Sequence, residues 1–489
     1  MMLSRKLFLS SLAAAGAELC RAGVAKEDKP LLKLGVMSDS HVTTDPETAE
    51  PLRRMFRHMA AENVDAVLHA GDICELGTLA ELAYVMDAWK GAFPNGRNAS
   101  GRPVVPFFVF GNHDYHSASY MRNKPVTDAD RAAGILYNKD KAWRMIADEP
   151  FPGEVYAKTV NGFTLIGAHW SHEAEMADWF KAHPVDPARP VFYVQHPHPK
   201  GTCFGKWAGG KPDATPALAE HHNLFSVSGH SHITVSDDRA VWQGGFVSMG
   251  AGSARLVSVG RREGCENTGL KPWPDGVFRH MGGASSGGAW QASIISVYAD
   301  RVVVTRHDYR HDEPLGEPWR LDFPFRHDSA APYLVADAAL APQFPEGAAV
   351  KVLERKGLRR PDRLEERQVW VKVPAAVGDG SHARAFYYRF EVLDDATGKT
   401  LMERKVVQDD TSLAEPRTRL KDGWCAFAKA ELPVARTVRF RVCPMNTSGR
   451  AGRPVESAPF MVKADARNRS IARASAIRAW PAGRGCARP

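Results

Sequence analysis

The chain has 489 residues, which is too long for one compact domain, so two or three folded units are expected. A hydrophobic fraction of 44% excludes a largely disordered protein. The formal net charge of +8 is not spread over the chain, because residues 464–489 contribute +5 through six arginines and Asp465. We therefore predict no nucleic-acid partner and interpret residues 464–489 as a basic flexible tail.

The N-terminus has the pattern of an export signal. Arg5 and Lys6 precede an apolar run over residues 7–17 that is too short to span a bilayer. Small residues at Gly23–Ala25 offer a cleavage site before the chain becomes polar. We predict a signal over residues 1–25, an exported protein that is periplasmic or extracellular, and no transmembrane segment after signal removal.

Short apolar runs alternate with helical patterns from residue 31 to about residue 330. The runs are rich in Val, Ile, Leu and Phe, which is typical of strands buried on both faces. Helical patterns cover Glu50–Glu62 and Leu79–Trp89. This alternation predicts an α/β domain over residues 26–330. The expected strands are Leu31–Met37, Ala66–Leu68, Val104–Phe110, Phe163–Ile166, Val191–Val194 and Leu224–Val227.

The end of this region has a different composition. Residues Arg255–Trp290 are rich in Gly, Ser, Arg and Pro, so we interpret them as a long loop or insertion that shapes the mouth of a pocket. The segments Ala292–Val297 and Arg301–Arg306 then follow as the strands of a hairpin.

A smaller all-β domain is predicted over residues 335–463. Apolar and polar residues alternate along Gln368–Val373, Phe386–Val392 and Thr437–Val442, and no helix-length pattern interrupts them. The segment Phe440–Gly449 resembles the last strands of a fibronectin type III sandwich. A β-sandwich of another topology is the alternative.

Five polar clusters each follow one of the apolar runs. Ligands of open α/β sheets bind outside the carboxyl ends of strands, so clusters at five such ends can converge on one spot. Each cluster alone is a weak signal, since Gly and Asn also favour turns. The ordered set is far more specific. The clusters are Ser38–His41, Gly71–Glu75, Gly111–Asp114, Gln195–His198 and Gly229–His232.

The residue types in these clusters fit a pair of metal ions. Imidazole and carboxylate ligands suit first-row divalent ions, and two ions roughly 3.5–4 Å apart can share a carboxylate and a bridging hydroxide. With only Asp39 and Asp72 as carboxylates, the loaded site is positive and attracts an anionic substrate. We expect two divalent ions, Mn, Fe or Zn. The expected ligands are Asp39, His41, Asp72, Asn112, His196, His230 and His232.

Over roughly residues 31–310 these motifs resemble the calcineurin-like metallophosphoesterase superfamily. The resemblance implies a four-layer αββα sandwich and the hydrolysis of a phosphate mono- or diester by a bridging hydroxide. It implies that Asp72 bridges the two ions. It also implies one ion held by Asp39, His41 and His232, and a second held by Asn112, His196 and His230.

Two further residues are expected to act in catalysis. By the same resemblance His113 contacts the substrate phosphate and assists the leaving group, and Asp114 orients His113. The departing oxygen would be stabilised or protonated by His113.

Several positions leave alternatives open. His198 lies two residues after His196 and could exchange roles with it, although His196 directly follows the apolar run. His169 and His172 are interpreted as loop residues, with the site as the alternative. Glu75 occupies the position where purple acid phosphatases carry a tyrosine, so no purple iron–tyrosinate centre is expected.

Seven cysteines leave at least one unpaired within a monomer. We considered two disulfides as hypotheses, Cys425 with Cys443 and Cys74 with Cys203.

Two other classes of function are compatible with the sequence. The chain could be an exported binding protein that keeps the metal fold without catalysis, although every expected ligand type is present. Alternatively, the β domain could bind carbohydrate or a surface through Trp370, Tyr387 and Trp424. Core packing is the preferred interpretation of these three aromatics.

Overall fold

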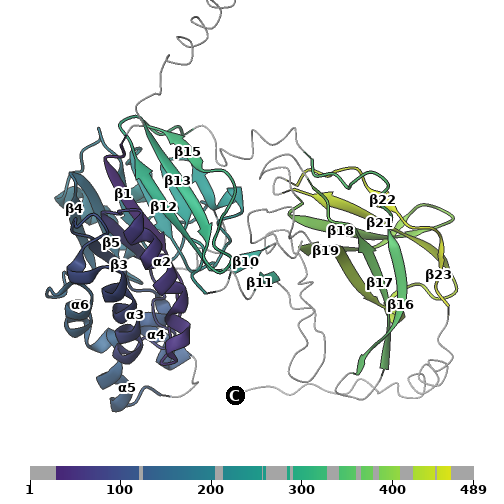
Figure 1. Cartoon of the computed structure of the whole chain (residues 1–489), viewed down its shortest axis with the longest axis horizontal. Helices are drawn as coiled ribbons and strands as arrows, with labels where there is room; N and C mark the ends of the chain where they lie inside the picture. The colour runs from purple at the N-terminus through teal and green to yellow at the C-terminus, as the bar shows by residue number, and fades with distance from the viewer. Residues whose placement is uncertain are drawn as a thin grey trace, which may run out of the picture.

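In the computed structural model the chain folds into an α/β region followed by a C-terminal β region (Figure 1). The predicted signal and basic tail lie outside the described residues. The structure describes residues 29–120, 125–203, 213–255, 257–259, 284–286, 290–327, 341–359, 365–377, 385–407, 422–446 and 449–463.

The α/β region contains two mixed sheets. In the first, β1, β2 and β3 are parallel, while β12 and β13 join the β1 side in antiparallel pairs. The hairpin expected after the insertion is therefore part of this sheet. Its strands in spatial order are β14 (Glu313–Pro314), β13 (Arg301–Asp308), β12 (Gln291–Val297), β1 (Leu32–Met37), β2 (Ala66–Ala70) and β3 (Val105–Val109), with β15 (Trp319–Asp322) paired to β13.

The second sheet has four parallel strands between two antiparallel edges. The central strands are β5, β6, β7 and β9, and β4 and β8 close the two sides. Its strands in spatial order are β4 (Val155–Val160), β5 (Phe163–Ala168), β6 (Val191–Val194), β7 (Leu224–Ser228), β9 (Val247–Gly250) and β8 (Val241–Gln243).

The two sheets share one hydrophobic core. Val36 and Leu68 of the first sheet belong to the same buried cluster as Phe192 and Val227 of the second. Tyr193, one residue after Phe192, lies on the opposite face, because side chains alternate along a strand. That opposite face packs on α7 (Met176–Ala182) and α8 (Thr215–Leu218).

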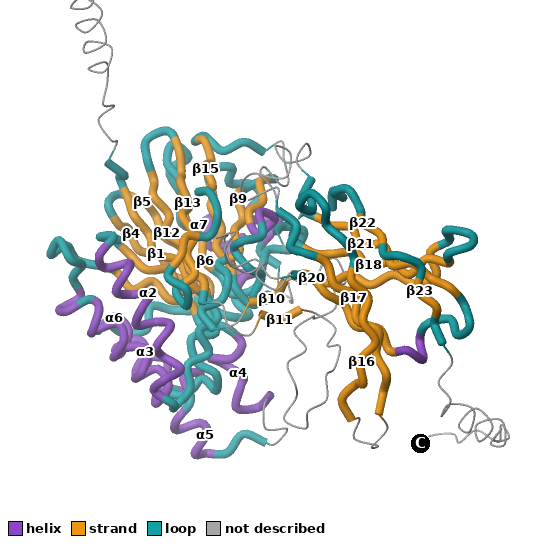
Figure 2. The backbone as a smooth tube through the Cα atoms, turned by 45° about the vertical axis from the view of Figure 1, so that its right-hand side comes forward, coloured by secondary structure: helices purple, strands orange, loops and turns teal. Residues whose placement is uncertain are grey.

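Helices α2 (Glu50–Ala61) and α3 (Leu79–Ala92) cover the first sheet. Along α2, Leu52, Met55, Phe56 and Met59 recur at helical spacing and are fully buried. Helix α3 begins with a capping box at Thr78. Figure 2 shows α2, α3 and α6 along one side of this sheet. The other helices are α4 (Asn112–Tyr120), α5 (Asp128–Ala133) and α6 (Lys139–Ala147), and the short 3-10 turns are η1 (Pro46–Ala49), η2 (Pro94–Gly96), η3 (Ile135–Tyr137), η4 (Glu173–Glu175), η6 (Asp238–Ala240) and η9 (Lys429–Glu431).

The C-terminal β region consists of two antiparallel sheets with a common core. Val369 and Phe427 of the three-stranded sheet pack in one cluster with Phe390 and Phe440 of the five-stranded sheet. The sheets contain β16 (Lys351–Arg359), β17 (Glu365–Val373) and β20 (Gly423–Ala428), and β19 (Thr400–Val407), β18 (Tyr387–Asp394), β21 (Thr437–Met445), β22 (Val455–Glu456) and β23 (Phe460–Met461).

Two expectations from the sequence are corrected. The segment Arg255–Trp290 is not wholly a loop, because β10 (Val257–Val259) pairs with β11 (Ala284–Ser286). The two disulfide hypotheses are wrong, since none of the four described cysteines forms a disulfide. Cys425 points into the core between the β sheets, whereas Cys443 packs in a separate cluster. Cys74 lies in the α/β core, and Cys203 contacts His198.

The core interpretation of the three β-region aromatics is only partly right. Tyr387 is buried. Trp370 and Trp424 are half-buried and stack on each other, with ring centroids 4.7 Å apart. Arg355 lies over the Trp370 ring at 4.8 Å. Trp370 thus packs against a second ring and a guanidinium, which stabilises the sheet surface.

Candidate metal centre

The seven predicted metal ligands lie directly after the carboxyl ends of five strands. Three of these strands belong to the first sheet and two to the second, so the site forms where the two sheets end together. Asp39 and His41 follow β1, Asp72 follows β2, Asn112 follows β3, His196 follows β6, and His230 and His232 follow β7.

Asp39, His41 and His232 form a first group of potential ligands. His232 Nε2 lies 3.1 Å from Asp39 Oδ1 and 3.2 Å from His41 Nε2. These ligand atoms come from loops 191 residues apart in sequence, yet they face one point. One carboxylate and two imidazoles are a suitable donor set for a first-row divalent ion.

Asp72, His196 and His230 form a second group beside the first. His196 Nε2 lies 3.0 Å from Asp72 Oδ2 and 3.2 Å from His230 Nδ1. The other oxygen of Asp72, Oδ1, accepts the backbone amide of His113. Asp72 Oδ2 also lies 3.9 Å from His41 Nε2, so it stands between the two groups.

The backbone at this site is strained in a consistent way. Five of the seven predicted ligands have positive φ, a region that non-glycine residues rarely adopt. Such strain persists only where surrounding structure enforces it, and it concentrates at functional sites. The residues are Asp39 (51°), His41 (45°), Asp72 (52°), His230 (64°) and His232 (53°).

Glycines allow the loops to approach one another. A Cβ on Gly71 would lie 2.5 Å from His196 Nδ1. A Cβ on Gly229 would collide with Ser38 Oγ and Asp39 Oδ2. The Gly-Asp and Gly-His pairs of the sequence therefore serve close packing of strand ends, besides supplying the ligands that follow.

Two observations fit a bound cation. The side-chain oxygen of Asn112 is buried and has no hydrogen-bond partner among the described residues. The ring of His196 is fixed from behind, because its Nδ1 lies 2.7 Å from the Ala70 carbonyl oxygen, which leaves Nε2 directed at Asp72. Asn112 Oδ1 presents a lone pair to the cluster, and His196 Nε2 would present one on losing its proton.

The pKa shifts of the ligand side chains also indicate that the two buried carboxylates are stabilised by positive charge. Burial opposes ionisation of Asp39 and Asp72, but nearby histidines hold the pKa of both carboxyls well below the usual range. Burial would lower the pKa of His196, yet Asp72 and Asp39 raise it to about 9. For His230, burial and the neighbouring His196 lower the pKa to about 4. Without metal, the His196 imidazolium thus offsets the two carboxylates, and a metal ion would displace its proton.

His113 has a ring nitrogen close enough to His41 and Asp72 to form a third group of potential ligands, but its expected partner is different. Its ring lies 4.6 Å from that of His41, and its Nδ1 is 2.9 Å from the Glu75 carbonyl oxygen. The carboxylate of Asp114 instead accepts the backbone amides of Ile73, Cys74 and Gly111. Glu75 therefore orients His113.

Asp114 instead holds two of the site loops together. It joins the loop after β2 to the loop after β3 through those amides. Burial and Asp72 raise the pKa of Asp114 to about 7, an effect that the amide bonds oppose. The expectation that Asp114 orients His113 is corrected, because the path of the backbone brings three amides to its carboxylate.

The other histidines near the motifs have structural partners. His198 is buried with Nε2 2.6 Å from Ser231 Oγ, so His196 and not His198 joins the cluster. His169 is buried against the rings of Phe110 and Tyr156 and accepts the amide of Phe110. His172 pairs with glutamates at the surface.

Two further residues contact the ligands. Glu75 Oε2 lies 3.1 Å from His41 Nδ1 and 3.1 Å from Arg255 Nη1, so Glu75 orients a ligand. Trp170 packs against the rings of His196 and His230 edge-on and at a tilt, with centroids 5.8 and 5.4 Å away. No motif marks Trp170, although it follows β5 two residues after that strand ends.

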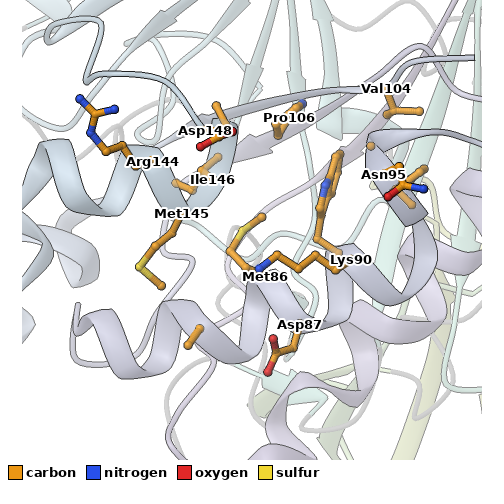
Figure 3. A pocket seen from close by; sticks show the side chains of 15 residues that line it. Met86, Asp87, Lys90, Asn95, Val104, Pro106, Arg144, Met145, Ile146 and Asp148 are labelled. Atoms are coloured by element: carbon orange, nitrogen blue, oxygen red, sulfur yellow. The ribbon is translucent and has the colours of Figure 1, made fainter.

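A pocket elsewhere in the α/β region is unrelated to this cluster. It has a volume of about 620 Å³ and lies between α3, α6 and β3, where Met86, Met145 and Ile146 line it beside Lys90 and Asp148 (Figure 3). None of its lining residues is a predicted ligand.

Within the described part of the chain, no helix has the length and apolar character needed to cross a membrane.

Comparison with known families agrees with this geometry. Residues 32–234 match the model of the family described as calcineurin-like phosphoesterase. That span contains all nine residues predicted for the site. The chain therefore carries a calcineurin-like metallophosphoesterase domain, followed by a β-rich region. A search of curated proteins found no match.

Several solved structures resemble the chain weakly. A dimetal phosphatase from Danio rerio is 12% identical over 60% of this chain and 100% of its own, with a TM-score of 0.34. Purple acid phosphatase PPD1 from yellow lupin (Lupinus luteus) is 10% identical over 60% of this chain and 53% of its own, with a TM-score of 0.37. An archaeal phosphodiesterase is 13% identical over 59% of this chain and 100% of its own, with a TM-score of 0.25. Similarities of this size do not identify a substrate.

Proposed function

We propose that the protein is a metal-dependent phosphoesterase that hydrolyses a phosphate mono- or diester. The observation that carries this proposal is the convergence of three overlapping groups of potential metal-binding side chains at the ends of both sheets, the third of them being His41, Asp72 and His113. The family match over residues 32–234 supports the same class of reaction.

The ligands divide into two ion sites under this proposal. Asp72 would be shared, since its Oδ2 lies 3.0 Å from His196 Nε2 and 3.9 Å from His41 Nε2. Divalent ions at such sites, Mn, Fe or Zn, polarise phosphoryl oxygens and lower the pKa of water. Asp39, His41 and His232 would hold one ion, and Asn112, His196 and His230 the other.

His113 is proposed to act on the leaving group. A carbonyl oxygen only accepts hydrogen bonds, so the contact with Glu75 places a proton on His113 Nδ1. Nε2 is then the atom that can hold a second proton and give it to the departing oxygen. The backbone amide of His113 also donates to Asp72, which ties the position of this residue to that of the shared ligand.

The direct test is hydrolysis of a chromogenic phosphate ester by the purified chain after loading with manganese. We expect turnover that a chelator abolishes and added metal restores. The competing possibility is an exported binding protein that keeps the metal site without catalysis. Stoichiometric metal together with no hydrolysis of any ester in a broad panel would favour that alternative.

Further features belong to the proposal. The shared core of the two sheets and the helices on their outer faces support a four-layer sandwich over residues 26–330. The two antiparallel sheets support a β-sandwich domain over residues 335–463, with fibronectin type III as the proposed topology. Export through a signal at residues 1–25 to the periplasm or the exterior is proposed from the sequence alone.

A further inference from the structure

A second group of polar side chains lies behind the metal ligands, on the face of the second sheet that packs on α7 and α8. Tyr193 on β6 pairs in register with Ser226 on β7, and both are fully buried. Ser228 lies two residues after Ser226 on β7, so its side chain points to the same face, and Gln195 comes directly after β6, two residues beyond Tyr193. Glu173 in η4 precedes α7, which covers this face, and it is only 2% exposed.

Each of these five side chains carries an unpaired oxygen. Glu173 Oε1, Tyr193 Oη, Gln195 Oε1 and the Oγ atoms of Ser226 and Ser228 are buried without a hydrogen-bond partner in the described structure. Buried polar atoms are nearly always paired in native proteins, so five on one face favour a ligand as their common partner. The amide nitrogen of Gln195 is occupied by the Pro197 carbonyl, which leaves Oε1 free to accept.

We propose that this oxygen group binds an alkali cation, Na⁺ or K⁺. All five unpaired atoms are oxygens, which favours a hard cation over the transition metals that nitrogen donors select. The set contains one carboxylate, Glu173, so one positive charge balances it, whereas a divalent ion would leave net charge buried. Among the described residues, no lysine or arginine forms an ion pair with Glu173, whose carboxyl is near the backbone amides of Ser171 and Glu173 and is influenced by His196.

The position of the cation gives it a structural role. Gln195 directly precedes His196, and Ser228 is separated from His230 only by Gly229. A cation held by Tyr193, Gln195, Ser226 and Ser228 would join the ends of β6 and β7 from the side opposite the metal ligands. This site is separate from the proposed divalent pair, and it does not depend on phosphoesterase activity.

The test compares the thermal unfolding of the full chain, freed of divalent ions, in NaCl, KCl and choline chloride at equal ionic strength. We expect a melting temperature several degrees higher in NaCl or KCl than in choline chloride. Glu173→Gln should abolish this difference. Glu175→Gln, an exposed glutamate of the same 3-10 turn, should preserve it.

If Glu173→Gln fails to fold, substitution of an uncharged residue of the proposed cation site still tests the proposal. Tyr193→Phe keeps the ring packing and removes one oxygen, so the cation concentration needed for half-maximal stabilisation should rise about tenfold. Equal melting temperatures of the wild type in all three salts would overturn the proposal and assign the five oxygens to ordered water. A Glu173→Gln variant that still distinguishes Na⁺ or K⁺ from choline would overturn it as well.

Discussion

His113 lies beside the metal ligands without belonging to either ion group in our proposal, so its substitution should separate chemistry from metal binding. Its Nδ1 contacts a backbone carbonyl, and the ring of His41 is 4.6 Å away. For His113→Ala we expect turnover to fall roughly 10²–10⁴-fold, the usual contribution of general acid catalysis. Metal content, measured by elemental analysis, should stay near that of the wild type. His172→Gln, a surface histidine, is the control, and unchanged turnover in His113→Ala would remove this residue from the mechanism.

Asp72 should behave differently, because it stands between the two groups of ligands. Asp72→Asn keeps the shape of the side chain and removes its charge, and the contact with His196 Nε2 at 3.0 Å loses its attraction. We expect loss of both bound metal and activity, measured on the same sample by elemental analysis and ester hydrolysis. Asp87→Asn on the exposed side of α3 should change neither. Retention of two ions by Asp72→Asn would contradict the shared role.

At the residue scale, whether the sequence predicts a site residue depends on the type of contact that the residue makes. Asp39, His41 and the other predicted ligands were found because each directly follows an apolar strand. The partner of Asp114 was not, because its three hydrogen bonds go to backbone amides whose directions depend on the path of two loops. Trp170 carries no motif, and its place over His196 follows only from the three-dimensional arrangement of β5 and β6.

At the element scale, the strand ends must approach closely, and Gly229 tests this requirement. An added Cβ would collide with Ser38 Oγ and Asp39 Oδ2, so Gly229→Ala should push the β7 loop from the β1 loop. We expect metal affinity to fall at least tenfold by titration, with lower stability. Gly91→Ala within α3 is the matched control, because a Cβ there meets no atom within 4 Å. That variant should gain about 0.5–1 kcal/mol of stability from reduced chain entropy and keep wild-type affinity.

The elements that sequence patterns revealed are those with long apolar runs or helical periodicity. β1, β6, β7, α2 and α3 match their predicted positions to within a few residues. Short edge strands escaped notice. β8 has three residues and β14 two, so neither contains enough alternation to distinguish a strand from a turn.

For the whole molecule, removal of metal should weaken the fold as well as the activity. Two carboxylates and several imidazoles meet at the junction of both sheets, and a ligand that binds only the folded state stabilises it by mass action. At a metal concentration one hundred times Kd this amounts to about 2.7 kcal/mol per site. We expect the midpoint of urea unfolding to fall on chelation and to recover with added metal. An unchanged midpoint would mean that the described cluster binds no ion tightly.

The metal-free chain should be most stable near neutral pH. Burial lowers the pKa of His69 and His169 to about 3, whereas an unfolded histidine titrates near about 6.5. As pH falls below 6.5, these two imidazoles bind protons in the unfolded chain but stay neutral in the folded chain. The free energy of unfolding therefore decreases by about 1.4 kcal/mol per pH unit for each histidine. His196 acts in the opposite sense. Because its pKa is about 9 in the folded chain, His196 contributes its full stabilisation below pH 6.5, and this contribution is lost as pH rises toward 9.

His169→Gln isolates one of these contributions. His169 accepts the amide of Phe110 at 2.9 Å, and a glutamine oxygen can take over this contact without binding a proton. Between pH 7 and 5 the free energy of unfolding from urea titrations should fall less in this variant, by about 2 kcal/mol in total. His183→Gln, an exposed histidine, should retain the wild-type slope. Equal slopes for His169→Gln and the wild type would show that His169 is not held neutral in the folded chain.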